Sequence, residues 1–214
     1  TKACMTGLLR NSGQSCNAPS RLIVPKARLA EAEAVAAAVA NGIVIGDPAN
    51  PGTQMGPLAN EAHYQSVQRF IERGLNEGAH LVAGGTGHPN GLDQGWYARP
   101  TVFSRVADDA HVVQEEAFGP VLVIQSYDTV DEAVELANRC EFGLSAYVVG
   151  PDLALAQQTA RRLQAGMVHI NGAEMSLAMP FGGFKRSGLG RKFGPEGLKA
   201  YLEPQSILIP AAAT

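Results

Sequence analysis

A cysteine in a small, glycine-containing turn is the residue of this chain best suited to chemistry. Cys16 follows Gly13 within the string NSGQSCNA (11–18) and precedes the apolar run LIV (22–24). Glycine lets backbone amides approach a reacting atom closely, and a thiol beside such amides ionises more readily. The pattern therefore predicts a nucleophilic Cys16, and the alternative is a buried, inert cysteine.

A thiol hydrolase is the obvious rival for a single reactive cysteine. Such an enzyme needs a histidine base and a third group that orients it. The histidines at 63, 80, 88, 111 and 169 occur in helix-start, loop or strand contexts, and none has a recognisable catalytic signature around it. They form no HExxH or Cys/His zinc pattern either. We therefore disfavour a hydrolase and expect no metal site.

The glycines near the C-terminus resemble two phosphate-binding motifs without completing either. Gly188 and Gly190 open like a dinucleotide fingerprint, but Phe193 occupies the third glycine position. The spacing from 183 to 188 fits a P-loop, but Leu189 stands where its lysine is required. We expect a solvated loop here, not a phosphate site.

Composition indicates a globular protein with a real core. Of 214 residues, 45% are hydrophobic and 17% charged, and the net charge of −3 predicts no nucleic-acid or membrane partner. Three cysteines without CxxC spacing favour a reducing compartment, and we expect a cytoplasmic protein. Because the chain begins inside an apparent amphipathic helix, we expect a piece of a longer protein, with any targeting signal outside it.

Apolar strands alternate with helices along the chain. The pattern predicts helices at 27–42, 60–77, 130–139 and 153–164, with Asn60 as the N-cap of the second. It predicts strands at 81–83, 101–103, 121–124, 146–149 and 167–170. Such alternation is typical of an α/β fold, here a three-layer αβα domain with a mainly parallel sheet. The tail run Ser206–Ile209 predicts one more strand, with no helix after it.

The cysteine string resembles the nucleophile motif of the aldehyde dehydrogenase superfamily. The resemblance continues, in order, through MGPL (55–58), RPTVF (99–103), EEAFGPV (115–121), FGLSA (142–146), PFGGFK (180–185) and SGLGR (187–191). Collinear blocks over nearly the whole chain are far more specific than one short motif. The resemblance implies a catalytic domain at 1–200 and an oligomerisation strand or tail at 201–214, without the dinucleotide-binding domain.

The resemblance also assigns roles to individual residues. Cys16 would attack an aldehyde carbonyl, with its own backbone N–H stabilising the oxyanion, and hydride would pass to NAD or NADP. Glu116 would bind the nicotinamide-ribose hydroxyls and Phe118 would pack beside them, whereas Glu115 would be a surface or structural residue. Substrate-pocket positions are implied for Ser15, Asn17, Met175 and Phe181.

Several alternatives stay open at this stage. Partners would be a small-molecule aldehyde and further copies of the chain in a homo-oligomer. A relative that passes the acyl group to coenzyme A would share these motifs, because the glutamate that activates water lies outside this chain. Alone, the chain could instead be a non-catalytic, self-associating domain. The sequence leaves the aldehyde and the choice between NAD and NADP undetermined.

Overall fold

The computed structural model describes residues 1–211 and shows an α/β fold built on a four-stranded sheet. The strand order is β1 (Arg21–Pro25), β4 (Val121–Tyr127), β3 (Thr101–Ser104) and β2 (His80–Ala83). Strands β1, β4 and β3 are parallel, and β2 adds an antiparallel edge. The mainly parallel sheet that the sequence predicts is thereby confirmed.

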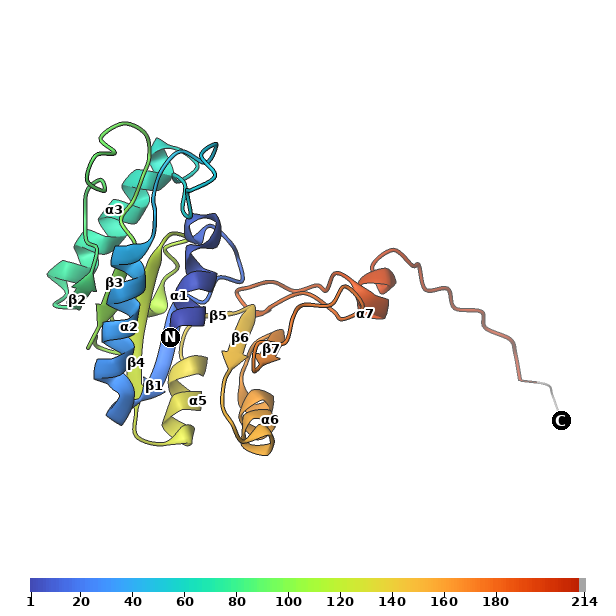
Figure 1. Ribbon diagram of the computed structural model, residues 1–214. Coiled ribbons are helices and arrows are strands. Elements are labelled where there is room, and N and C mark those ends of the chain that lie inside the picture. Colours follow the sequence, from blue (N-terminus) through green and yellow to red (C-terminus); the bar gives the residue numbers. More distant parts are fainter. Residues whose placement is uncertain (212–214) are drawn as a thin grey trace.

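Helices cover both faces of this sheet, which gives three layers (Figure 1). Leu122 and Ile124 of β4 pack towards α1 (Lys2–Leu9) and α2 (Leu29–Gly42). Their neighbours Val121 and Val123 pack on the opposite face, towards α3 (Glu61–Asn76) and α4 (His111–Gln114). Alternate strand residues point to opposite faces, so a strand covered on both sides is apolar throughout.

Local signals account for the main helix boundaries. The Asn60 side chain accepts from the backbone N–H of His63 and so caps α3 at the predicted residue. Helix α2 begins at Leu29, two residues later than predicted, because the 3₁₀ turn η2 (Lys26–Arg28) precedes it. A second 3₁₀ segment, η1 (Arg10–Gly13), follows α1 and leads into the cysteine turn.

The chain beyond Tyr127, after β4, forms an arm beside the main sheet (Figure 1). Its elements are α5 (Val130–Asn138), β5 (Phe142–Gly143), β6 (Ser145–Val148), α6 (Leu153–Arg162), β7 (Met167–Ile170), β8 (Phe184–Lys185) and α7 (Gly194–Lys199). Strands β6 and β7 pair in parallel in a sheet of their own, and β5 pairs with β8. The predicted strands at 146–149 and 167–170 are thus present, but they do not join the four-stranded sheet.

The predicted tail strand Ser206–Ile209 is not a strand in this structure. Residues 203–211 are irregular, and Ile207, Leu208 and Ile209 are 78%, 93% and 83% exposed. A strand requires hydrogen bonds to a neighbouring strand, and no described part of the chain reaches this segment. The end of the predicted tail, 212–214, lies outside the described residues. None of the helices described could span a bilayer.

Candidate active site

The candidate residues meet at the amino-terminal edge of the parallel strands. The Cys16 turn leads into β1, and the loop of Glu116 and Phe118 leads into β4, which pairs with β1 in parallel. Open α/β sheets usually bind ligands beyond the carboxyl ends of their strands. This site therefore lies at the edge opposite to the usual one.

The segment before Cys16 has an unusual backbone that tertiary contacts hold in place. Asn11, Ser12 and Gly13 are consecutively left-handed, with φ of 50°, 57° and 77°. This region is unfavourable for residues other than glycine. Ser12 is buried and donates to the carbonyl of Gly56 at 2.8 Å, and Gln14 accepts from the backbone N–H of Ala59 at 2.9 Å. These bonds fix the approach to the turn.

Cys16 occupies a tight turn in which its thiol is exposed. The turn is closed by the backbone N–H of Ala18, which donates to the carbonyl of Ser15 at 2.9 Å. Within residues 1–211, the backbone N–H of Cys16 donates to no protein acceptor. A reachable thiol and an available N–H on the same residue are what attack on a carbonyl and stabilisation of the resulting oxyanion require.

The other two cysteines are packed differently. Burial raises the pKa of the Cys4 thiol to about 11, and its Sγ lies 3.4 Å from the carbonyl oxygen of Pro19. Cys140 is half-buried, with Sγ 3.5 Å from the carbonyl oxygen of Phe142. Of the three thiols, Cys16 alone is exposed.

A glycine contact joins the cysteine turn to the second loop. A Cβ added at Gly13 would overlap the carbonyl group of Gly119. Gly119 is itself buried, next to Phe118. The two loops can therefore meet only with glycine at position 13.

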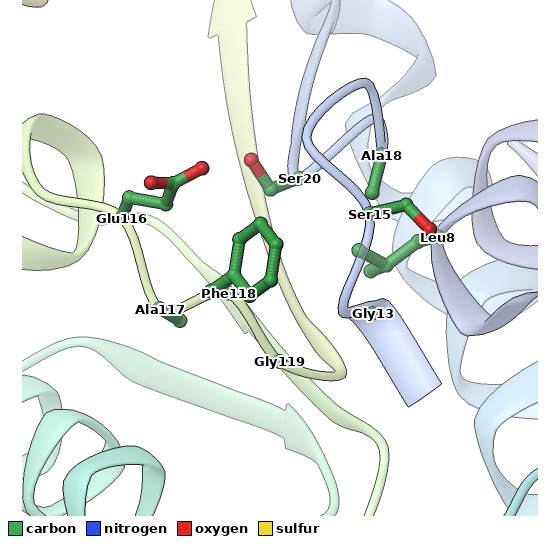
Figure 2. Close-up of a pocket in the computed structure, with 9 residues that line it drawn as sticks. All are labelled: Leu8, Gly13, Ser15, Ala18, Ser20, Glu116, Ala117, Phe118 and Gly119. Carbon is green, nitrogen blue, oxygen red and sulfur yellow. The ribbon is translucent and has the colours of Figure 1, made fainter. Parts of the chain in front are cut away.

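These loops together line a shallow pocket, which Figure 2 shows with the Phe118 ring between the Glu116 loop and the cysteine turn. Ser15 contributes from the turn and Ser20 from the residue just before β1. The Glu116 side chain is exposed and bonds to no other described residue. A free carboxylate accepts from both hydroxyls of a vicinal diol, and the partly exposed Phe118 ring offers an adjoining apolar face. The pair fits a nicotinamide ribose.

His63 fixes this second loop, a role that no sequence motif predicted. Its Nε2 lies 2.8 Å from the carbonyl oxygen of Phe118, so this nitrogen carries the proton and donates. Phe118 has a left-handed backbone with φ of 49° and needs such support. Glu115 instead forms an ion pair with Arg73, 2.9 Å from Nη1 to Oε1, which suits the structural role predicted for it.

A contact between the buried His111 and the partly exposed Glu77 supports the same loop. His111 lies 2.8 Å from Glu77 through Nδ1 and 2.9 Å from the carbonyl oxygen of Phe70 through Nε2. Nδ1 thus faces a carboxylate and Nε2 faces a backbone carbonyl, and both of these groups are acceptors. The hydrogen bond of His111 to Glu77 is the main cause that lowers the pKa of that carboxyl to about 2. The His111 carbonyl in turn accepts from the backbone N–H of Glu115 at 2.7 Å.

The remaining predicted pocket residues lie elsewhere. The Asn17 carbonyl accepts from the Tyr147 hydroxyl at 2.9 Å. Met175 is 48% exposed in the arm, and the Phe181 ring packs edge-on against Phe193. The pocket lining includes none of Cys16, Asn17, Met175 and Phe181, so their substrate contacts stay predictions. In the described part of the chain, no group of three or more His, Cys, Asp or Glu side chains could hold a metal ion.

Known proteins match this chain along almost its whole length. The chain is 44% identical to 3-succinoylsemialdehyde-pyridine dehydrogenase of a Pseudomonas species over 201 residues, which are 94% of the chain and 42% of that protein. Aldehyde dehydrogenase C of Pseudomonas syringae, solved as a mutant with NAD⁺ and octanal, superposes with a TM-score of 0.95 at 49% identity. This match covers 99% of the chain and 44% of that structure.

A second solved structure agrees. Mycobacterium tuberculosis aldehyde dehydrogenase with NAD⁺ gives a TM-score of 0.93 at 36% identity, over 99% of this chain and 44% of that one. The chain thus spans less than half the length of the relatives it matches. The model of the aldehyde dehydrogenase family matches residues 1–207. With its cysteine turn, its second loop and its fold all in agreement, the chain belongs to the aldehyde dehydrogenase family.

Proposed function

We propose that this chain supplies the nucleophile and the nicotinamide-ribose contacts of an NAD(P)-dependent aldehyde dehydrogenase. One observation carries the proposal: the turn of the exposed Cys16 and the loop of Glu116 and Phe118 line a single pocket. Ser15 and Ala18 of the cysteine turn line the same pocket as Glu116, which supports a carbonyl adduct on Cys16 near the hydride acceptor. The Pseudomonas syringae relative, solved with NAD⁺ and octanal, supports this assignment.

The chemistry follows from the groups of the turn. The Cys16 thiolate adds to the aldehyde carbon, and the carbonyl π electrons move to oxygen, where the Cys16 N–H stabilises the charge. When bound, NAD(P)⁺ accepts the hydride, which leaves a thioester on Cys16. Water then cleaves the thioester and releases the carboxylic acid and the free thiol. Glu116 and Phe118 would hold the ribose so that the hydride path stays short.

The chain alone holds too little of the cofactor to act efficiently. One charge-assisted hydrogen-bonding group contributes about 1.5–3 kcal/mol, whereas micromolar binding requires about 8 kcal/mol. We therefore place the rest of the NAD(P) site, and the base that activates water, in the part of the relatives' length that this chain does not span. General-base help of that kind is typically worth about 10²–10⁴-fold.

Three further features belong to the proposal. The substrate is a small-molecule aldehyde, with Ser15, Asn17, Met175 and Phe181 as candidate contacts. Release of the acyl group to water is preferred over release to coenzyme A.

The exposed tail run Ser206–Ile209 would pair with another chain, because an open apolar edge favours association. A reducing, cytoplasmic setting suits the three free cysteines.

The test is NAD(P)H formation by the full-length protein with short aliphatic and aromatic aldehydes. We expect turnover that a Cys16→Ser variant loses. The 214-residue chain alone should form no NAD(P)H. The same result is expected if the chain alone is a non-catalytic, self-associating domain. Full-length protein that is folded and inactive with every aldehyde would contradict the proposal. Turnover that requires coenzyme A would show that coenzyme A, and not water, accepts the acyl group.

A further inference from the structure

A tyrosine of the arm holds the cysteine turn from outside. Tyr147 lies in β6 and donates from its hydroxyl to the carbonyl oxygen of Asn17 at 2.9 Å. The N–H of the same peptide unit belongs to Ala18 and donates to the carbonyl of Ser15 at 2.9 Å. Both polar groups of the Asn17–Ala18 peptide, one residue beyond Cys16, are therefore anchored, one within the turn and one by Tyr147.

The phenol ring is itself held in place. Tyr147 is the register partner of His169 in the neighbouring strand β7, and their rings stack 5.0 Å apart with 17° between the planes. The His169 Nδ1 lies 2.8 Å from the carbonyl oxygen of Ala173, so it donates and fixes the imidazole. A ring stacked on a fixed neighbour loses little further freedom when its hydroxyl forms a hydrogen bond.

The hydroxyl also stays protonated where the enzyme would work. Burial is the main cause that raises the pKa of Tyr147 above its usual value near 10, and a Cys16 thiolate nearby acts in the same direction. A neutral phenol remains a donor to the Asn17 carbonyl when Cys16 ionises. The contact therefore persists through the nucleophilic state of the thiol.

We propose that Tyr147 is a positioning residue for Cys16, acting through the Asn17 carbonyl to orient the thiol and the Cys16 N–H towards the aldehyde. This inference rests on the proposed function of Cys16 as the nucleophile. Because β6 lies outside the four-stranded sheet, the hydrogen bond also ties the arm to the turn. The arm carries Met175 and Phe181, so Tyr147 aligns these candidate pocket residues with the nucleophile.

The experiment compares Tyr147→Phe with wild type in the full-length protein. The variant keeps the stacked ring and loses only the hydroxyl. We expect kcat to fall about 3- to 10-fold, the range for one neutral hydrogen bond. The rate of Cys16 alkylation by iodoacetamide should fall similarly, whereas Cys140 alkylation, the KM for NAD⁺ and the melting temperature should not change. The control is Tyr127→Phe, at the far end of β4, which should alter none of these.

A second variant covers the case in which Tyr147→Phe folds poorly. His169→Ala keeps the hydroxyl and removes the stacked neighbour, and we expect a smaller fall in both kcat and Cys16 alkylation. Unchanged kcat and unchanged Cys16 alkylation in Tyr147→Phe would overturn the inference. Turnover that survives Cys16→Ala would instead overturn the proposed function, so the two failures are distinguishable.

Discussion

Gly13 packs so closely against the carbonyl group of Gly119 that no side chain fits between them. The contact holds the turn of the candidate nucleophile against the loop of the candidate ribose ligand Glu116. Position 13 favours glycine for two reasons. Its φ is +77°, and its Cα faces backbone atoms that cannot move aside.

Replacing Gly13 with alanine should lower the free energy of unfolding by more than the strain of a left-handed backbone alone would. Gly78 is the matched control, because its φ is +83° and a Cβ there would meet nothing within 4 Å. We expect Gly78→Ala to destabilise the protein by about 1 kcal/mol and Gly13→Ala by about 3 kcal/mol. Urea unfolding measures both. Equal losses in the two variants would show that the contact with Gly119 is not restrictive.

Removing the His63 side chain should affect cofactor binding rather than the thiol. His63→Ala deletes the donor to the Phe118 carbonyl, so the Glu116 loop becomes less ordered. We expect the KM for NAD⁺ to rise about 3- to 10-fold in the full-length protein, with Cys16 alkylation unchanged. The control His80→Ala alters an exposed histidine at the start of β2. An unchanged KM in His63→Ala would show that the loop needs no such support.

The contact of Glu77 with His111 should make stability depend on pH in a defined window. The pKa of Glu77 falls from 4.5 to about 2 on folding, so its stabilisation is complete above about pH 4.5 and is lost towards pH 2. We expect Glu77→Gln to cost about 2 kcal/mol at pH 7, less than a fully buried pair, because 32% of the Glu77 side chain is exposed.

Urea unfolding at pH 7, 5, 4 and 3 measures this dependence. The difference in unfolding free energy between wild type and Glu77→Gln should stay constant down to pH 5 and then shrink. Glu72→Gln, an exposed position on the same helix, should show no comparable difference. A difference in unfolding free energy that grows as the pH falls would contradict the lowered pKa of Glu77.

The cysteines should react in an order set by burial. With a pKa of about 11, Cys4 is ionised to about one part in a thousand at pH 8, and it is also shielded from the reagent. Mass-mapped iodoacetamide labelling of the full-length protein at pH 8 should therefore modify Cys16 first and Cys4 last. Labelling of Cys4 as fast as Cys16 would show that the core around α1 opens readily.

Local patterns predicted the elements whose signals lie within a few residues. Strand β7 has the predicted bounds, and α3 begins after its predicted cap Asn60. The helix α7 was missed although Pro195 in its first turn is a helix-start signal. The tail run Ser206–Ile209 is irregular in the single chain, because β-propensity does not supply a hydrogen-bonding partner, and its pairing with another chain stays a prediction.

The site was predicted only in part, for a physical reason. Motifs identified Cys16, Glu116 and Phe118, but the groups that hold them are distant in sequence. His63 reaches Phe118 across 55 residues, and Tyr147 reaches Asn17 across 130. No local spacing encodes such contacts, which arise only when the sheet and the arm have formed.

The most direct test of the account is to trap the acyl group on the enzyme. Full-length protein is mixed with NAD⁺ and an aldehyde that it oxidises, quenched in acid within one turnover, digested and mapped by mass spectrometry. We predict the corresponding acyl thioester on the peptide that contains Cys16, and no adduct in the Cys16→Ser variant. An acyl group on another residue, or NADH formation by Cys16→Ser at the wild-type rate, would contradict the central claim that Cys16 is the nucleophile.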